Sequence, residues 1–308
     1  MGDTAVSFNE ASTNARFGRP GHVPGTTSPY TPAMTAAPIH HLDVSNYRVS
    51  PNSSLGLSSF DSNADGGLDK DAAKPIMKEL NQRLEVLQER LYAHGRERLL
   101  VVLQATDTGG KDGTIRAVFE HTNPQGVHVA SFKRPTSEEL AHDYLWRVHK
   151  HTPAAGHITI FNRSHYEDVL VVRVKQLVEE AQWKKRYEHI RNFEQMLADE
   201  GTTIVKIYLH ISKEEQRERL QARIDNPDKH WKFEIGDLKE RLVWDEYQLA
   251  FEEMLAETST DAAPWYVIPA NRKWYRNVVI SQLLVNTLEG MAGKDFEPNP
   301  DLVGLVVE

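Results

Sequence analysis

Residues 99–115 read LLVVLQATDTGGKDGTI, and this stretch decides the fold. Its apolar beginning, Leu99–Leu103, predicts a buried strand, the glycines that follow predict a tight turn, and Lys111 begins a predicted helix. The turn nearly matches the phosphate-binding pattern in which two glycines separated by four residues precede a lysine and a serine or threonine. A glycine-rich turn can also be only a tight connection. Here strand, turn and helix follow in the order that the motif requires, which favours phosphate binding.

The turn departs from that pattern at two positions. Ala105 stands where the first glycine belongs, and Asp112 replaces the serine or threonine whose hydroxyl usually binds Mg²⁺. A carboxylate, that of Asp107, lies inside the turn instead. Since the usual hydroxyl ligand is missing, we interpret Asp107 as the replacement metal ligand.

The rest of the turn keeps the physical features of an anion site. Glycines allow the backbone to turn sharply and to direct N–H groups inward. The helix after them offers its positive N-terminal end to an anion, and Lys111 adds a mobile positive charge for phosphate oxygens. The predicted phosphate-binding residues of the turn are Thr108, Gly109, Gly110, Asp112, Gly113 and Thr114.

Composition limits the class of protein. The chain has 308 residues, which suggests one large domain or two small ones, and 40% of them are hydrophobic, enough for a sizeable core. The absence of cysteine excludes disulfides, thiol catalysis and cysteine-bound zinc. A formal net charge of −8 argues against nucleic acid as a partner, so a polyanion would need a local basic site. Without a long apolar run or an apolar signal core, we expect a cytoplasmic protein and no membrane partner.

The chain divides into segments of different composition. Proline, serine, threonine and glycine recur near the N-terminus, and we expect residues 1–45 to be a mobile extension because they can bury little apolar surface. Residues 46–95 are expected to pack on the core, mainly as a helix. We expect the phosphate-loop domain over residues 96–290, with a basic lid at about 212–240, and a C-terminal tail over 291–308.

Predicted strands and helices alternate along this domain. The predicted strands are residues 99–103, 127–132, 158–161, 203–209 and 265–268. The predicted helices are residues 71–94, 111–120, 136–150, 190–197, 214–224, 238–255 and 274–288. This alternation predicts an α/β fold, with a central parallel sheet between layers of helices.

Basic side chains follow several predicted strands, at the sheet edge where ligands of such folds bind. Lys133 and Arg134 follow the second strand and suit a phosphate, although they could also be a solvated surface pair. Residues Asn271–Arg276 follow the last strand and could bind phosphates or a base. A further basic cluster surrounds a proline-broken helix end and predicts a lid that closes over phosphates. It comprises Arg217, Arg219, Arg223, Lys229, His230 and Lys232.

The third predicted strand leads into Asn162, where many phosphate-loop enzymes carry an acid that organises Mg²⁺. Asn162 offers a neutral oxygen ligand in its place. The next residue, Arg163, can bridge donor and acceptor phosphates by bidentate bonds and neutralise the transferring charge. Arg163 could alternatively form a structural ion pair with Glu167 or Asp168. We expect His165 to be structural, since a phosphate nucleophile already carries charge and needs no base.

These motifs together resemble the polyphosphate kinase 2 family. The resemblance covers about residues 45–290 and rests on four long stretches in the family's order, namely residues 104–115, 161–170, 229–233 and 263–277. Asn162 and Glu167 are similar to those of the subgroup that phosphorylates both nucleoside monophosphates and diphosphates. Other subgroups carry aspartate at the first of these positions.

The resemblance implies phosphoryl transfer between inorganic polyphosphate and a nucleotide, AMP or ADP and also GMP or GDP, with Mg²⁺ or alternatively Mn²⁺. It implies the three-layer phosphate-loop kinase fold, related to thymidylate kinase, and a homo-oligomer, either a dimer or a tetramer. By this similarity Asp107 binds metal, Lys111 contacts the transferred phosphate and Arg223 belongs to the lid. The residues that would face the acceptor nucleotide and the metal are Asn162, Arg163 and Glu167.

The residues alone indicate phosphoryl transfer without naming the donor, because this chemistry needs positioning and charge neutralisation more than covalent catalysis. Two other functions share the same features. One is an ATP-dependent nucleoside monophosphate kinase, for which polyphosphate would be inert. The other is a non-enzymatic polyanion-binding protein with an inactive phosphate loop, which would bind polyphosphate without turnover.

Overall fold

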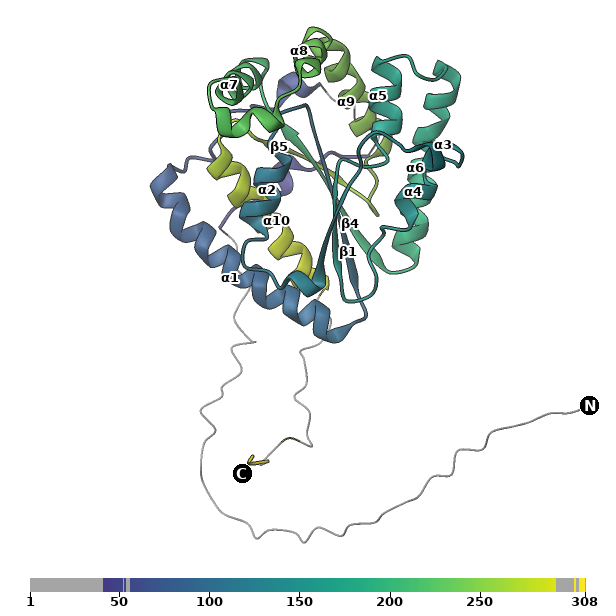
Figure 1. The fold of residues 1–308 in the computed structure, drawn as a ribbon. Coiled ribbons are helices and arrows are strands. Elements are labelled where there is room, and N and C mark those ends of the chain that lie inside the picture. Colours follow the sequence, from purple (N-terminus) through teal and green to yellow (C-terminus); the bar gives the residue numbers. More distant parts are fainter. Residues whose placement is uncertain (1–40, 52, 54–55, 292–301, 303–304, 308) are drawn as a thin grey trace, which may run out of the picture. The chain divides into compact units, whose positions relative to one another are not determined.

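The strand of residues 99–103 lies at the centre of a five-stranded parallel sheet (Figure 1). The computed structural model describes residues 41–51, 53, 56–291, 302 and 305–307. The strands are β1 (Arg98–Ala105), β2 (Val127–Ser131), β3 (Ile158–Asn162), β4 (Thr202–His210) and β5 (Trp265–Pro269), in the spatial order β2-β3-β1-β4-β5. Each coincides with a predicted strand to within one or two residues at either end, so the predicted parallel sheet is confirmed.

Helices form most of the connections between the strands. They are α1 (Lys70–His94), α2 (Lys111–Val118), α3 (Ser137–Leu140), α4 (Trp146–His149), α5 (Glu167–Val174), α6 (Glu180–Asp199), α7 (Lys213–Ile224), α8 (Ile235–Leu242), α9 (Trp244–Thr258) and α10 (Lys273–Met291). Short 3₁₀ turns are η1 (Ser45–Tyr47), η2 (Leu57–Ser59), η3 (Pro124–Gly126) and η4 (Pro227–Lys232).

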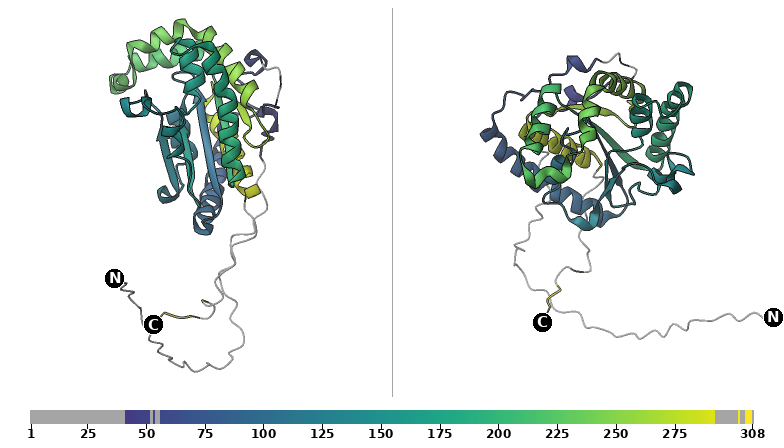
Figure 2. Two further views of the ribbon diagram at one scale, coloured as in Figure 1. Left: turned by 90° about the vertical axis from the view of Figure 1, so that its right-hand side faces the viewer. Right: turned by 45° about the horizontal axis from the view of Figure 1, so that its top comes forward.

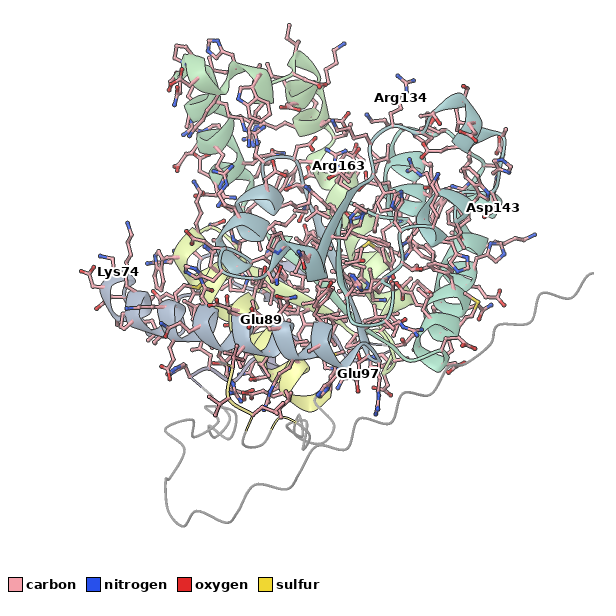
Figure 3. All side chains as sticks on the ribbon, turned by 60° about the horizontal axis from the view of Figure 1, so that its bottom comes forward. Lys74, Glu89, Glu97, Arg134, Asp143 and Arg163 are labelled. Carbon is pink, nitrogen blue, oxygen red and sulfur yellow. The ribbon has the colours of Figure 1, made fainter. Side chains whose placement is uncertain are left out.

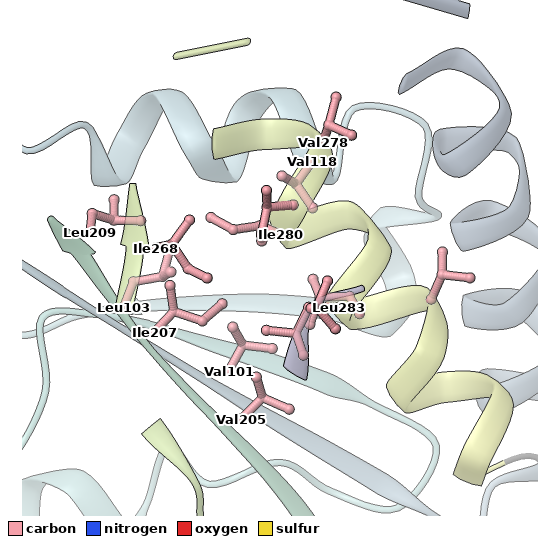
Figure 4. Packing of buried hydrophobic residues seen from close by; sticks show 14 of the residues in the cluster. Val101, Leu103, Val118, Val205, Ile207, Leu209, Ile268, Val278, Ile280 and Leu283 are labelled. Atoms are coloured by element: carbon pink, nitrogen blue, oxygen red, sulfur yellow. The ribbon is translucent and has the colours of Figure 1, made fainter. Parts of the chain in front are cut away.

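Alternate side chains of β1 point into two separate cores, because successive residues of a strand face opposite sides of a sheet. Val101 and Leu103 pack in one core with α1, α2 and α10 (Figure 4). Leu100 and Val102 pack in the other, with α5, α6 and α9. The resulting layers of helix, sheet and helix are seen from another side in Figure 2 and confirm the predicted sandwich.

The continuous helix predicted over residues 136–150 is wrong. Two short helices, α3 and α4, occupy this stretch with a turn between them. The carboxylate of Asp143 causes the interruption, since it accepts hydrogen bonds from the backbone N–H groups of Leu145 (3.0 Å) and Trp146 (3.1 Å). An aspartate that bonds to the backbone in this way competes with helical hydrogen bonding and starts a new turn.

The helix predicted over residues 238–255 is also divided. Helix α8 begins earlier, at Ile235, and ends before Val243, which has φ −103° and ψ 31°. Helix α9 starts at the next residue and packs Phe251, Met254 and Leu255 into the core of α5 and α6. The break therefore separates a buried helix from α8, whose residues are not buried.

The described residues before α1 pack on the edge of the sheet. Arg48 forms an antiparallel bridge with Tyr266 of β5, and Val49 donates its N–H to the carbonyl of Trp265 at 2.8 Å. Residues 1–40 of the predicted mobile extension lie outside the described residues, as does most of the predicted tail at 291–308. Among the described residues, no helix has the length and apolar character needed to cross a membrane.

Candidate functional site

Loops from neighbouring strands converge at the carboxyl edge of the sheet. The parallel register pairs Leu103 of β1 and Ser131 of β2 with Asn162 of β3, so these strands end at one level. The predicted metal and phosphate ligands follow these ends. Helices α7 and α8 lie at the same end of the molecule, near the top of Figure 1.

The turn between β1 and α2 is tight, and two of its glycines are required by their surroundings. The N–H of Gly109 bonds to the carbonyl of Thr106 at 3.0 Å, and Gly110 precedes α2 with φ +105°. A Cβ on Gly109 would lie 2.4 Å from that of Ala105, and a Cβ on Gly110 would lie 2.2 Å from Nη1 of Arg276. Larger residues therefore cannot adopt this turn without displacing a neighbour.

Two of the predicted phosphate-binding residues have constrained positions. The buried side chain of Thr114 is turned back onto the turn, because its hydroxyl and its N–H both donate to the carbonyl of Gly110, at 3.1 and 2.9 Å. Thr108 is buried and has the left-handed φ of +62°. In this loop Asp112 and Gly113 are exposed and Gly110 and Lys111 are partly exposed, whereas neither threonine side chain lies on the exposed face.

Lys111 lies among the charged groups of the site. Its ammonium donates to the carbonyl of Ala105 at 3.1 Å. Desolvation and the Arg163 guanidinium lower the pKa of Lys111, and the carboxylates of Asp107 and Glu167 oppose that shift. The four side chains from three segments therefore share one electrostatic environment.

Arg163 connects the phosphate loop to the loop after β3. Its guanidinium lies 2.9 Å from Oδ1 of Asp107 and 3.8 Å from Oε2 of Glu167. Desolvation raises the pKa of Glu167, although Arg163 and Lys111 oppose that shift. Arg163 therefore forms the ion pair with Glu167 that the sequence left open, and it also contacts the phosphate loop through Asp107. Asp168 lies elsewhere and pairs with Arg186 at 3.2 Å.

Asn162 at the end of β3, Asp112 of α2 and Lys232 of the lid form one chain of contacts. The Asn162 side-chain amide donates to Oδ1 of Asp112 at 2.9 Å, and the Lys232 ammonium lies 3.4 Å from Oδ2. Desolvation opposes ionisation of Asp112, but the bonds from Asn162 and Lys232 outweigh it and lower its pKa. Asp112 thus holds side chains in place.

Arg219 lies behind the phosphate loop, whereas the sequence placed it in a lid over the phosphates. Its Nη1 donates to the carbonyls of Thr108 (3.1 Å) and Gly109 (3.0 Å), and its Nη2 donates to that of Ala270 at 2.6 Å. The side chain is buried, and Glu215 accepts its Nε–H at 2.7 Å. The predicted lid position of Arg219 was wrong because Arg219 lies on the face of α7 that packs inward, so its side chain points to the loop and not to the solvent.

A second buried guanidinium supports the same loop. Arg276, on the first turn of α10, lies with Nη1 3.4 Å from the carbonyl of Gly110. Burial and the neighbouring charge of Arg219 lower the pKa of Arg276 to about 10. Two cations therefore stand against the back of the loop, where they strengthen the positive potential that its front offers to an anion.

The lid is held together by its own contacts. The Arg223 guanidinium donates to the carbonyl of Lys232 at 2.9 Å and lies 3.8 Å from Asp237 of α8. Desolvation and the charge of Asp107 raise the pKa of Asp237. Arg217, in contrast, pairs with Glu214 on the exposed face of α7 and does not face the phosphate loop.

Lys133 and Arg134 lie exposed after β2, and neither has an ion-pair partner among the residues that the structure describes. The buried Arg147 holds their loop, because its Nη1 donates to the carbonyl of Lys133 at 2.9 Å. Figure 3 shows Arg134 projecting at the rim, whereas Arg163 lies towards the centre. Both cations remain available to a polyanion at this edge.

The sequence interpretation missed a buried ion pair beneath the site. The ammonium of Lys206 on β4 lies 2.6 Å from Oε2 of Glu194 on α6, and both side chains are almost fully buried. The only signal was a lysine within the otherwise apolar run Ile204–Leu209. His165, expected to be structural, is buried and contacts the same glutamate at 3.2 Å.

The chain is similar to known proteins in sequence and in fold. The family model described as Polyphosphate kinase 2 matches residues 67–295. An AMP/ADP-polyphosphate phosphotransferase of Meiothermus ruber is 59% identical over 85% of this chain and 99% of its own. An ADP-polyphosphate phosphotransferase of Rhodopseudomonas palustris is 46% identical over 71% and 80% of the two chains. The crystal structure of polyphosphate kinase 2 from Arthrobacter aurescens is 44% identical, with a TM-score of 0.78 over 82% and 93% of the chains.

Proposed function

Because this chain belongs to the polyphosphate kinase 2 family, we propose that it transfers a phosphoryl group between inorganic polyphosphate and a nucleotide, converting AMP and ADP, and also GMP and GDP, to the next higher phosphate. The relatives named above support AMP and ADP as acceptors. A GDP-polyphosphate phosphotransferase of Mycolicibacterium smegmatis, 34% identical over 70% of this chain and 73% of its own, supports the guanine nucleotides.

The observation that carries the proposal is the position of Arg163 between two loops. Its guanidinium reaches Asp107 of the phosphate loop on one side and Glu167 of α5 on the other, beside Lys111. A donor phosphate on the loop and an acceptor phosphate beyond β3 would meet at this guanidinium. Arg163 would then neutralise charge on the group in transfer, where such stabilisation lowers the barrier most.

The other site residues have supporting roles in this proposal. Lys111 contacts the transferred phosphate, and Asn162 and Glu167 face the acceptor nucleotide. The donor is held by the backbone of the loop and by cations, and this set comprises Thr108, Gly109, Gly110, Asp112, Gly113, Lys133, Arg134 and Arg223. The predicted contact from Thr114 is not part of it, because its hydroxyl and its N–H both donate to the carbonyl of Gly110. Arg223 would contact phosphates from the lid, and Lys133 from the loop after β2. We propose that the chain works in the cytoplasm as a dimer or tetramer.

The residues of the site fit a divalent metal. Mg²⁺ is usually held by one or two carboxylates together with substrate phosphates. No cluster of three or more acidic, histidine or cysteine side chains suited to a metal occurs among the described residues, which agrees with such a sparse site. The side-chain nitrogen of Asn162 donates a hydrogen bond to Asp112, so the side-chain oxygen of Asn162 is the atom that would coordinate a metal. Asp107 and Asn162 would hold Mg²⁺, or alternatively Mn²⁺, and the ion would neutralise charge on the phosphates.

Product analysis tests the proposal. The protein is incubated with AMP, ADP, GMP or GDP, each with polyphosphate and separately with ATP, with Mg²⁺ and with a chelator. We expect ATP from ADP and polyphosphate only when the metal is present. Turnover with ATP and a monophosphate while polyphosphate is inert would identify an ordinary monophosphate kinase. Polyphosphate binding without any product would identify a binding protein.

A further inference from the structure

In the segment Arg163–Glu167, the side chains of the first and last residues face the site, and the side chains of the three residues between them point into the core. Arg163 and Glu167 face the site, where they form an ion pair. The three residues between them, Ser164, His165 and Tyr166, are each fully buried. The contacts of these three side chains therefore determine where the two functional side chains lie.

Arg163 needs such support because its backbone is strained. Its φ is +62°, a left-handed conformation that residues with a side chain rarely adopt. The conformation costs free energy and persists only when the surrounding structure imposes it. Its own N–H contributes one contact, to the carbonyl of Leu103 at 3.2 Å. Strand β3 before it and the ion pair with Asp107 restrain it as well, and the residues that follow supply further contacts.

The side chains of two of those residues form hydrogen bonds to a single carboxylate. Oε1 of Glu194 accepts a hydrogen bond from the Tyr166 hydroxyl at 2.7 Å and one from Nε2 of His165 at 3.2 Å. Ser164 is held separately, since its hydroxyl accepts a bond from the Gln104 amide at 3.1 Å. Glu194 thus fixes the residue immediately before Glu167 and the second residue after Arg163.

Lys206 orients this carboxylate. Its ammonium donates to Oε2 of Glu194 (2.6 Å), to the Tyr166 hydroxyl (2.9 Å) and to the carbonyl of Thr258 (2.7 Å). Apolar side chains of similar volume usually stabilise a core as well as a buried ion pair does, or better. Stability alone therefore does not account for a charged pair at this place, directly beneath a strained functional turn.

We propose that Glu194, oriented by Lys206, is a positioning residue that holds Arg163 and Glu167 in the geometry of phosphoryl transfer through its bonds to His165 and Tyr166. The inference rests on the proposed function for its kinetic consequences. Its structural part, that Glu194 restrains the turn, stands without it.

Two double variants separate the hydrogen-bonding role from the charge. Lys206→Met with Glu194→Gln removes both charges but leaves an acceptor for His165 and Tyr166. Lys206→Met with Glu194→Met removes the acceptor as well. We expect the glutamine variant to stay within about threefold of the wild-type kcat, and the methionine variant to lose about ten- to a hundredfold, since small misplacements of reacting groups have effects of that size. KM for ADP should change little in either variant.

Two readouts distinguish positioning from loss of the fold. Both variants should remain folded at the assay temperature, and the methionine variant should melt lower because the buried Tyr166 and His165 lose their acceptor. Hydrogen exchange of the amides of residues 163–167 should quicken only in the methionine variant. The matched control is Arg83→Met with Glu289→Met, which removes another largely buried ion pair, 2.8 Å apart, between α1 and α10. This control should leave kcat and the exchange of the turn unchanged.

A methionine variant with wild-type kcat and wild-type exchange would overturn the proposal. If that variant does not fold, Tyr166→Phe decides, because it removes one bond to Glu194 and keeps the buried ring. We expect a severalfold lower kcat and faster exchange, and unchanged values of both would overturn the proposal. A wild-type protein that makes no ATP would refute the proposed function, and the exchange measurements would still decide whether Glu194 restrains the turn.

Discussion

The substitution Gly110→Ala tests whether activity requires the Arg276 guanidinium to stay in its position behind the phosphate loop. Gly110 has φ +105°, and an added Cβ would lie 2.2 Å from Nη1 of Arg276. Ordinary contact requires about 3.5 Å, so the guanidinium or the loop has to shift by about 1 Å. A misplacement of that size costs on the order of a hundredfold in rate when it reaches the reacting groups.

The backbone itself adds a second cost. A left-handed conformation costs a residue with a Cβ about 1–2 kcal/mol, which lowers the melting temperature of a domain of this size by about 2–8 °C. Gly95→Ala is the matched control, because Gly95 has φ +61° and an added Cβ there meets nothing within 4 Å. It should show the loss of stability without the loss of rate.

The assay is ATP formation from ADP and polyphosphate, with the melting temperature of each variant measured in parallel. We expect kcat/KM to fall about a hundredfold in Gly110→Ala and to stay near wild type in Gly95→Ala. Equal activity of the two variants would refute the reasoning, since both carry the backbone cost and only one displaces Arg276.

Three further predictions follow from the site and the core. Lys111→Ala should lose more kcat than Lys133→Ala, because a charge on the transferred group acts in the transition state; an increase in KM alone in both variants would make Lys111 only a binding residue. Asp107→Asn should reduce turnover strongly and polyphosphate binding less, and equal turnover at saturating Mg²⁺ would reject its metal role. Burial lowers the pKa of His210, so the unfolded chain binds a proton more readily and the melting temperature should fall as the pH drops through about 6.5. His210→Gln should flatten that decrease in a pH series of thermal melts, and an unchanged slope would exclude His210 as its cause.

The features that sequence predicts well here are local ones. The strand Leu99–Leu103, the glycine turn and the start of α2 at Lys111 follow from neighbouring residues, and the structure has all three. The side-chain bond of Asp143 to the backbone, in contrast, interrupts a stretch whose apolar spacing predicts one helix. The spacing of apolar residues does not show where a side chain competes with the helix for backbone hydrogen bonds.

The parts of the site that sequence reasoning missed depend on contacts between distant elements. Arg219 shares a face of α7 with the buried Gln216 and Leu220. This face carries polar residues, so amphipathic patterning gave no sign that it packs against the phosphate loop. Glu194 and Lys206 come from α6 and β4, and only the packing of that helix on the sheet brings their charges together.

The central claim is tested most directly by measuring, in one reaction of the full chain with ADP, polyphosphate and Mg²⁺, both the ATP formed and the phosphate lost from the polymer. Phosphoryl transfer from polyphosphate predicts one ATP for each phosphoryl group that the polymer loses, and no ATP when polyphosphate is omitted. ATP that appears without loss from the polymer, or no ATP at all with metal present, would contradict it.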